Sequence, residues 1–217
     1  RQMGDTICLD GHGESCLFEG HVLDLDGHPI QGAKLDVWSD NADGFYDVQQ
    51  PDLQPKWNNR GIFVTGADGS YSFVGIKPVS YPIPDDGPVG DMLEALGRTS
   101  YRPAHMHFLV TAPGYQKLVT HTFVAGDPHL ESDAVFGVKQ SLLASFERME
   151  GEPQWRSSFE FVLTRSAPAT RSEVRRVGKG SSRGGSPCQE TTKTRERHPN
   201  KVYTITTSPP GAYANYA

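Results

Sequence analysis

Two histidines separated by one residue are the first feature of this sequence that points to chemistry. They lie in the segment Arg102-Pro-Ala-His-Met-His-Phe108, which has the apolar residues expected of a strand. Successive strand side chains point to opposite faces, so His105 and His107 share one face while Met106 and Phe108 point into the core. Two imidazoles on one face form a natural metal chelate. Such a pair is more often two ordinary polar residues on a solvated strand, so by itself it is only a candidate metal site.

Two tyrosines in turn-like segments extend the candidate site. Zinc is disfavoured, because no cysteine or third histidine has the usual spacing from the pair. An Fe(II) facial triad is disfavoured as well, because no carboxylate has the offset from the pair that is typical of it. Tyr46 lies in Asp43-Gly-Phe-Tyr-Asp47 and Tyr81 in Ser80-Tyr-Pro-Ile-Pro84. A phenol with its pKa of about 10 is normally neutral, but a bound trivalent ion deprotonates it, and the resulting hard oxygen suits Fe(III). The alternative for either tyrosine is a packed ring with a hydrogen-bonded hydroxyl.

The elements that must position these residues are short strands and turns. Ala33, Leu35 and Val37 alternate with polar residues, which is the period of a half-buried strand. Further strands are expected at residues 22–25, 62–64, 71–74, 104–110, 118–124 and 159–163. Short helices are expected at about 88–96, ended by Gly97, and at about 135–146, with Asp133 as N-cap. Many short strands with few helices predict an all-β fold, an antiparallel β-sandwich.

Composition divides the 217 residues into two parts. Residues 1–165 contain 12 Lys and Arg against 23 Asp and Glu, whereas residues 166–217 contain 9 against 3. The second part is rich in Ser, Thr, Gly and Pro and lacks apolar periodicity, so we expect a disordered basic tail. Its stretch Arg171-Ser-Glu-Val-Arg-Arg-Val-Gly-Lys179 resembles a translation of sequencing-adapter DNA. The resulting hypothesis is that much of residues 166–217 is not native sequence.

Several classes of protein are disfavoured by simple features. No apolar run approaches the 18 residues of a membrane span, and the basic stretch lacks the interleaved aromatic residues of a nucleic-acid arm. The cysteines are Cys8, Cys16 and Cys188, too few and scattered for a disulfide framework. A Cys8–Cys16 bridge stays open, but reduced thiols in the cytoplasm are the preferred prediction.

Longer segments around the candidate ligands resemble the intradiol ring-cleaving dioxygenases. The matching segments are Asp43-Gly-Phe-Tyr-Asp-Val-Gln49, Tyr81-Pro-Ile-Pro-Asp-Asp-Gly-Pro-Val-Gly90 and Ser132-Asp-Ala-Val-Phe-Gly-Val-Lys139, which are most similar to the hydroxyquinol branch. The resemblance extends from about residue 18 to 165. It implies a β-sandwich catalytic domain within residues 1–165 and one non-haem Fe(III) per chain. The ligands that it implies are Tyr46, Tyr81, His105 and His107.

The resemblance also implies a reaction. The substrate is expected to be hydroxyquinol (benzene-1,2,4-triol), which O₂ opens between two hydroxyl-bearing carbons to give maleylacetate. Tyr81 is expected to leave the metal and accept a substrate proton, and Arg102 to stabilise negative charge beside the ring. An auxiliary role is expected for His121. The residues matching the substrate pocket are Ile83, Pro84 and Val135, beside Arg102.

Two other functions stay open. One is the same chemistry on catechol or a chlorocatechol, which gives muconates. The other is a non-catalytic β-sandwich binding module, since this architecture also occurs without enzyme activity. Family members that cleave hydroxyquinol or catechol carry an N-terminal helical dimerisation segment that nothing here matches. We therefore expect a chain truncated before Arg1, from a full-length protein that forms a homodimer.

Overall fold

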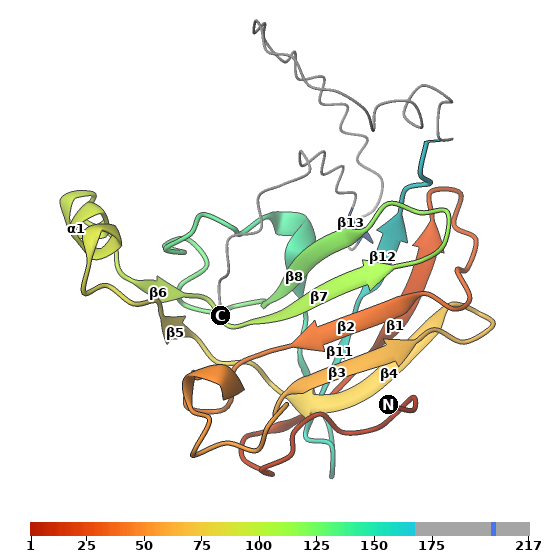
Figure 1. The fold of residues 1–217 in the computed structure, drawn as a ribbon, viewed down its shortest axis with the longest axis horizontal. Helices are drawn as coiled ribbons and strands as arrows, with labels where there is room; N and C mark the ends of the chain where they lie inside the picture. The colour runs from red at the N-terminus through yellow and green to blue at the C-terminus, as the bar shows by residue number, and fades with distance from the viewer. Residues whose placement is uncertain (168–200, 203–217) are drawn as a thin grey trace, which may run out of the picture.

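The computed structural model describes residues 1–167 and 201–202, and strands dominate this part of the chain. Two sheets form the layers of a sandwich (Figure 1). The six-stranded sheet has the order β10-β11-β1-β12-β13, with β4 also paired to β1. Its strands are β1 (Ser15–Asp24), β4 (Ser70–Ile76), β10 (Glu147–Arg148), β11 (Trp155–Ser158), β12 (Glu160–Leu163) and β13 (Lys201–Val202).

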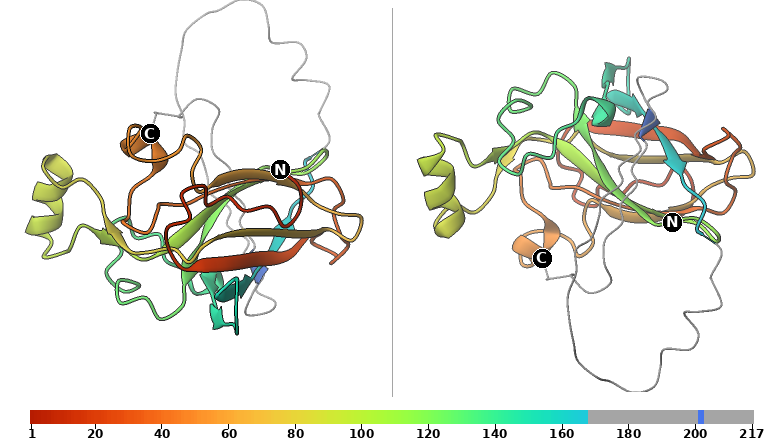
Figure 2. Two further views of the ribbon diagram at one scale, coloured as in Figure 1. Left: turned by 90° about the horizontal axis from the view of Figure 1, so that it is seen from below. Right: turned by 90° about the horizontal axis from the view of Figure 1, so that it is seen from above.

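The second sheet carries the histidine pair. Its five strands have the order β3-β2-β7-β8-β9. They are β2 (Lys34–Trp38), β3 (Arg60–Val64), β7 (His105–Thr111), β8 (Leu118–Val124) and β9 (Leu143–Ala144). A separate ribbon of β5 (Tyr81–Pro82) and β6 (Tyr101–Arg102) leads to α1 (Pro88–Ala95). Figure 2 shows this ribbon and α1 extending from one end of the sandwich.

The predicted β-sandwich is confirmed, but its sheets are mixed rather than wholly antiparallel. β1 pairs with β4 in antiparallel fashion and with both β11 and β12 in parallel fashion, and β8 pairs with β9 in parallel. Parallel neighbours need long connections, whereas a hairpin suffices for antiparallel ones. More than a hundred residues separate β1 from β11 and β12 along the chain, so no local turn determines the direction in which these strands pair.

One of the two predicted helices is present. α1 ends at Ala95 with Leu96 as its C-cap, and Gly97 follows at φ +63°, as a helix C-terminus prefers. The helix expected at about 135–146 is wrong: the segment contains only the 3₁₀ turn η2 (Gln140–Leu142) before β9. The Asp133 carboxylate does accept the backbone N–H groups of Val135 and Gly137, as the side chain of an N-cap would. Phe136 then takes φ +56°, so the backbone leaves the helical region at once.

Aromatic side chains fill the space between the sheets. Phe73 of β4 stacks between Phe18 and Phe63, with ring centroids 5.0 Å from each. Phe108 of β7 meets Phe161 of β12 at 4.7 Å, which joins the two layers. Met106 and Phe108 are both buried in this core, as the alternation along β7 predicts. The two histidines of β7 therefore face away from the core.

The structure tests only some of the remaining sequence predictions. Cys8 and Cys16 are free thiols, so the alternative of a bridge between them is wrong. Of residues 166–217, only 166–167 and 201–202 are described, and Lys201–Val202 pairs with β12 as β13. The predictions of disorder and of non-native sequence otherwise fall outside the described residues, as does Cys188. Within residues 1–167 and 201–202, no helix is long and apolar enough to cross a membrane.

The core beneath the histidine pair gives a first prediction. Phe108→Ala removes a ring buried between the sheets, and we expect it to lower the free energy of unfolding by about 3–5 kcal/mol. Val119→Ala on the neighbouring β8 is the control, because this side chain is 47% exposed; it should change stability by no more than about 0.5 kcal/mol. Urea denaturation measures both. Equal losses in the two variants would contradict the assignment of Phe108 to the core.

Candidate metal centre

Four side chains from three segments bring their polar atoms together. Tyr46 lies just before the 3₁₀ turn η1 (Asp47–Gln49), Tyr81 on β5, and His105 and His107 on β7. The two phenol oxygens are 2.9 Å apart and the two Nε2 atoms 3.0 Å apart. The Tyr46 oxygen lies 3.1 Å from His107 Nε2, and the Tyr81 oxygen 3.4 Å from His105 Nε2. The four atoms thus form a closed ring of short contacts.

The backbone fixes which nitrogen His105 offers to this ring. Its Nδ1 lies 2.7 Å from the carbonyl oxygen of Pro103. A carbonyl can only accept, so Nδ1 carries the proton and donates it, and Nε2 keeps its lone pair for a metal. Arg102 Nη1, 3.0 Å away, donates to this Nε2 atom.

The orientation of His107 is set by an aromatic neighbour. Trp38, opposite His107 in the β2–β7 register, stacks on the imidazole with ring centroids 4.9 Å apart and planes at 2°. A stacked indole restricts rotation of the imidazole, which keeps Nε2 directed at the other three donors. Trp38 was not predicted from the sequence as part of the site. The sequence does contain one indication: Trp38 follows Val37, so it lies on the face of β2 opposite to the buried Leu35 and Val37.

The loop that carries Tyr46 is held by polar contacts. The Asn41 side-chain oxygen accepts the backbone N–H groups of Asp43 and Phe45, and Asp47 pairs with Arg60 at 2.6 Å. Gly44, at φ +82°, lets this loop approach β5, because a Cβ there would lie 2.9 Å from the Cβ of Tyr81. The two tyrosine-bearing segments therefore meet at a position where glycine is required.

All four donors are neutral when no cation is present. Burial, followed by the nearby Arg102 charge, lowers the pKa of His105 to about 3, and burial with His105 beside it holds the pKa of His107 well below its ordinary value. Burial raises the pKa of both Tyr46 and Tyr81. Neutral imidazoles are the form that binds metals, and a phenol exchanges its proton for a metal ion.

The donor set fits a ferric ion. Imidazole nitrogen binds metals at about 2.0–2.1 Å, which places neighbouring donors of one ion about 3 Å apart. The four contacts of 2.9–3.4 Å have this spacing. The alternative of two packed tyrosines with unrelated hydroxyl partners is disfavoured, because each hydroxyl contacts the other and a histidine of β7. Two hard oxygens and two imidazoles are ligands that suit Fe(III).

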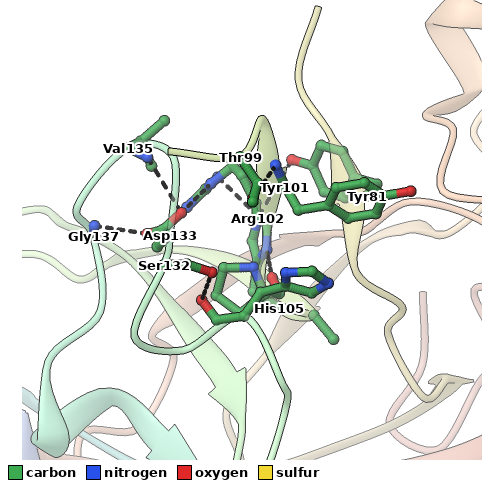
Figure 3. Close-up of polar contacts among 12 residues, drawn as sticks. Tyr81, Thr99, Tyr101, Arg102, His105, Ser132, Asp133, Val135 and Gly137 are labelled. Atoms are coloured by element: carbon green, nitrogen blue, oxygen red, sulfur yellow. Dashed lines mark hydrogen bonds and ion pairs between the residues drawn. The ribbon is translucent and has the colours of Figure 1, made fainter. Parts of the chain in front are cut away.

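Arg102 and His121 lie beside the four donors. Arg102 of β6 is 7% exposed, and its Nε donates to Asp133 at 3.3 Å (Figure 3). His121 of β8 is opposite His107 in the strand register, and its ring centroid is 5.5 Å from those of His105 and His107. Burial, with Arg102 next, lowers the pKa of His121 to about 4. Its buried Nε2 has no hydrogen-bond partner within the described part of the chain.

The residues expected to line the substrate pocket are half-buried or exposed. Ile83 is half-buried and Pro84 exposed, both just after Tyr81 on the ribbon that leads to α1. Val135 is also exposed, and its backbone N–H donates to Asp133, the partner of Arg102. Their roles in binding a substrate stay predictions.

Comparisons with known proteins find relatives of this chain among dioxygenases. The family model described as Dioxygenase matches residues 3–165. Hydroxyquinol 1,2-dioxygenase of Rhizobium sp. (strain MTP-10005) is 54% identical over 174 residues, covering 75% of this chain and 59% of the relative. For 6-chlorohydroxyquinol 1,2-dioxygenase of Cupriavidus pinatubonensis (strain JMP 134 / LMG 1197) the identity is 46% over 160 residues, covering 74% and 57%.

A solved structure gives the same result. Hydroxyquinol 1,2-dioxygenase from Pseudomonas putida DLL-E4 superposes with a TM-score of 0.72 at 44% identity, covering 76% of this chain and 61% of that one. The chain thus spans less than two thirds of the length of these relatives. The motifs around Tyr46, Tyr81 and the histidine pair correctly predicted the outcome: the chain belongs to the family of intradiol ring-cleavage dioxygenases.

Proposed function

We propose that this chain is the catalytic part of a non-haem Fe(III) enzyme that cleaves hydroxyquinol with O₂ to maleylacetate. The observation that carries the proposal is the ring of two phenol oxygens and two imidazole nitrogens at 2.9–3.4 Å. The relatives named as hydroxyquinol 1,2-dioxygenases, 44–54% identical, support the choice of substrate. A non-catalytic binding module would have no need of four converging donors.

Tyr46, Tyr81, His105 and His107 would hold the metal. Bound Fe(III) draws electron density from a chelated aromatic diol and so makes the ring reactive toward O₂. The residues of the chain have three tasks: to hold the ion, to take up substrate protons, and to stabilise negative charge on the ring. His105 and His107 suit the first task, since both are fixed on a packed strand by Pro103 and Trp38.

Tyr81 suits the second task better than Tyr46. It lies on the two-stranded β5–β6 ribbon that extends from the sandwich, and its 3.4 Å contact to His105 is the longest of the ring. Tyr46 is held closer, at 2.9 and 3.1 Å from its two neighbours. Because burial raises the pKa of the Tyr81 phenol, its phenolate would be a base strong enough to take a proton from a substrate hydroxyl, which is general-base catalysis.

Arg102 suits the third task. Its guanidinium is buried beside His105, and Nη2 has no hydrogen-bond partner among residues 1–167 and 201–202. A permanently charged fork with an uncommitted donor stabilises charge that develops on a bound ring. His121, with its unpartnered Nε2 on the same side, is proposed as an auxiliary polar group.

Catechol or chlorocatechol cleavage to muconates is the second candidate. It is favoured by relatives named catechol 1,2-dioxygenase of Candida albicans (strain SC5314 / ATCC MYA-2876), 42% identical, and chlorocatechol 1,2-dioxygenase of Rhodococcus opacus, 41% identical. Ile83, Pro84 and Val135 are proposed to line the pocket that selects among these rings. We also propose that the full-length enzyme is a cytoplasmic homodimer, with the free thiols of Cys8 and Cys16 supporting a reducing compartment.

A substitution at Tyr81 tests its role as ligand and base. Ferric protein with two phenolate ligands should have a reddish charge-transfer band. We expect Tyr81→Phe to weaken this band and to lower kcat by at least about 100-fold, because both a ligand and a base are lost. Visible spectra and oxygen uptake measure the two effects. Tyr115→Phe, at a ring that contacts Arg165 outside the site, is the matched control and should change neither. Full activity in Tyr81→Phe would exclude the assignment.

Oxygen uptake with different diols tests the proposed substrate. Equal concentrations of hydroxyquinol and catechol are compared on iron-loaded protein, with the products identified by mass spectrometry. We expect the larger kcat/KM for hydroxyquinol, with maleylacetate as product. A larger value for catechol, with a muconate as product, would replace hydroxyquinol by the second candidate.

A further inference from the structure

Asp133 is a buried carboxylate that the proposed mechanism does not use. It is 2% exposed and lies in the loop between β8 and η2, where one of its oxygens accepts Nε–H of Arg102 at 3.3 Å (Figure 3). We infer that Asp133 is a positioning residue that directs the guanidinium of Arg102 at the substrate. The inference rests on the proposed function, because it assigns Asp133 a part in that reaction.

Asp133 is itself held rigidly. One carboxylate oxygen accepts the Gly137 N–H at 2.7 Å and the other the Val135 N–H at 3.3 Å. The Asp133 carbonyl accepts Arg98 Nη2 at 2.9 Å, which ties the loop to the end of α1. Figure 3 shows Val135 and Gly137 on one side of the Asp133 carboxylate and Arg102 on the other. The carboxylate therefore has a position set by the loop and independent of Arg102.

A fixed carboxylate at Nε determines where the rest of the guanidinium points. The group is planar and rigid, so holding Nε places Nη1 and Nη2. Nη1 lies 3.0 Å from His105 Nε2, and Nη2 is buried without a partner in the described residues. If His105 Nε2 binds a metal, it no longer accepts from Nη1, and Nη1 would then be available to an anionic ring oxygen.

Charge and packing strengthen this link. A buried guanidinium without a counter-charge is strongly unfavourable, and the Asp133 carboxylate supplies that charge from the side away from the metal ligands. The packing around the pair is tight, since a Cβ on Gly137 would lie 3.2 Å from Asp133 Oδ2, 3.3 Å from His121 Nε2 and 3.6 Å from Arg102 Nη2. Small changes in this loop should therefore move Arg102.

A double-mutant cycle tests the inference. Asp133→Asn, Arg102→Gln and the double variant are loaded with iron, and kcat, KM and the visible band are measured for each. We expect Asp133→Asn to lower kcat about 10- to 100-fold, with KM changed less than about threefold and the band unchanged. In the Arg102→Gln background the same change should alter kcat less than about twofold, because two residues that act through one group are not additive. An equal loss of kcat in both backgrounds, or a change in KM alone, would overturn the inference.

Asp24→Asn is the matched control. Asp24 is also buried, accepts the backbone N–H groups of Asp26 and His28, and pairs with Arg165 at 3.1 Å, but it lies outside the site. It should lower the melting temperature as Asp133→Asn does and leave kcat unchanged. If Asp133→Asn does not fold, Gly137→Ala replaces it in the cycle, because it keeps every charge and presses on the same three atoms. The same non-additivity with Arg102→Gln is expected, and equal losses in both backgrounds would again overturn the inference.

A crystal structure of the metal-free variant separates this inference from the proposed function. We expect Arg102 Nη1 to leave its 3.0 Å contact with His105 in Asp133→Asn, or in Gly137→Ala if that variant is used. If the wild-type protein cleaves no diol, the proposed function fails, and the position of Arg102 alone decides the inference. An Arg102 side chain that keeps its place in the variant would overturn it.

Discussion

The alternation of side chains along β7 is the constraint on which the site depends. Met106 and Phe108 are held in the aromatic core, so His105 and His107 must both face the opposite side. β7 lies between β2 and β8 in its sheet, and these neighbours supply the side chains that frame the histidines. Trp38 of β2 stacks on one imidazole, and His121 of β8 lies near both. The packing of the core therefore sets the direction of the two histidines as well as stabilising the fold.

The four candidate ligands come from two kinds of segment. The histidines have their orientation fixed by a backbone carbonyl and a stacked indole. The tyrosines come from a turn and from a two-stranded ribbon outside the main sheets. In the proposed reaction one of the four candidate ligands, Tyr81, is exchanged, and this residue lies on the ribbon. The same ribbon ends in Arg102, which is paired with Tyr81 in its register.

The sequence predicted the histidine pair and the strand that carries it, because a period of two is a local property. It also predicted α1, since Gly97 ends that helix at a positive φ. Spacing alone could not show that Tyr46 and Tyr81 meet the pair, because their approach depends on the packing of Gly44 against Tyr81. The prediction that the two tyrosines share a site with the histidines came from the resemblance to a family. The helix predicted at 135–146 is wrong because Phe136 takes a positive φ. The parallel strand pairs were missed because they depend on contacts between residues far apart in the sequence. Asp133 was predicted as a helix cap and is better described as the anchor of a loop.

X-ray absorption at the iron edge tests most directly whether these four side chains form one ferric centre. The wild-type protein is loaded with Fe(III), its iron content is measured, and the scattering shell is compared with those of His107→Ala and Tyr46→Phe. We expect about one iron per chain, with two imidazole nitrogens and two phenolate oxygens, and the loss of the corresponding ligand in each variant. Iron bound without imidazole scattering, or a shell unchanged in both variants, would contradict the assignment of the metal centre to Tyr46, Tyr81, His105 and His107.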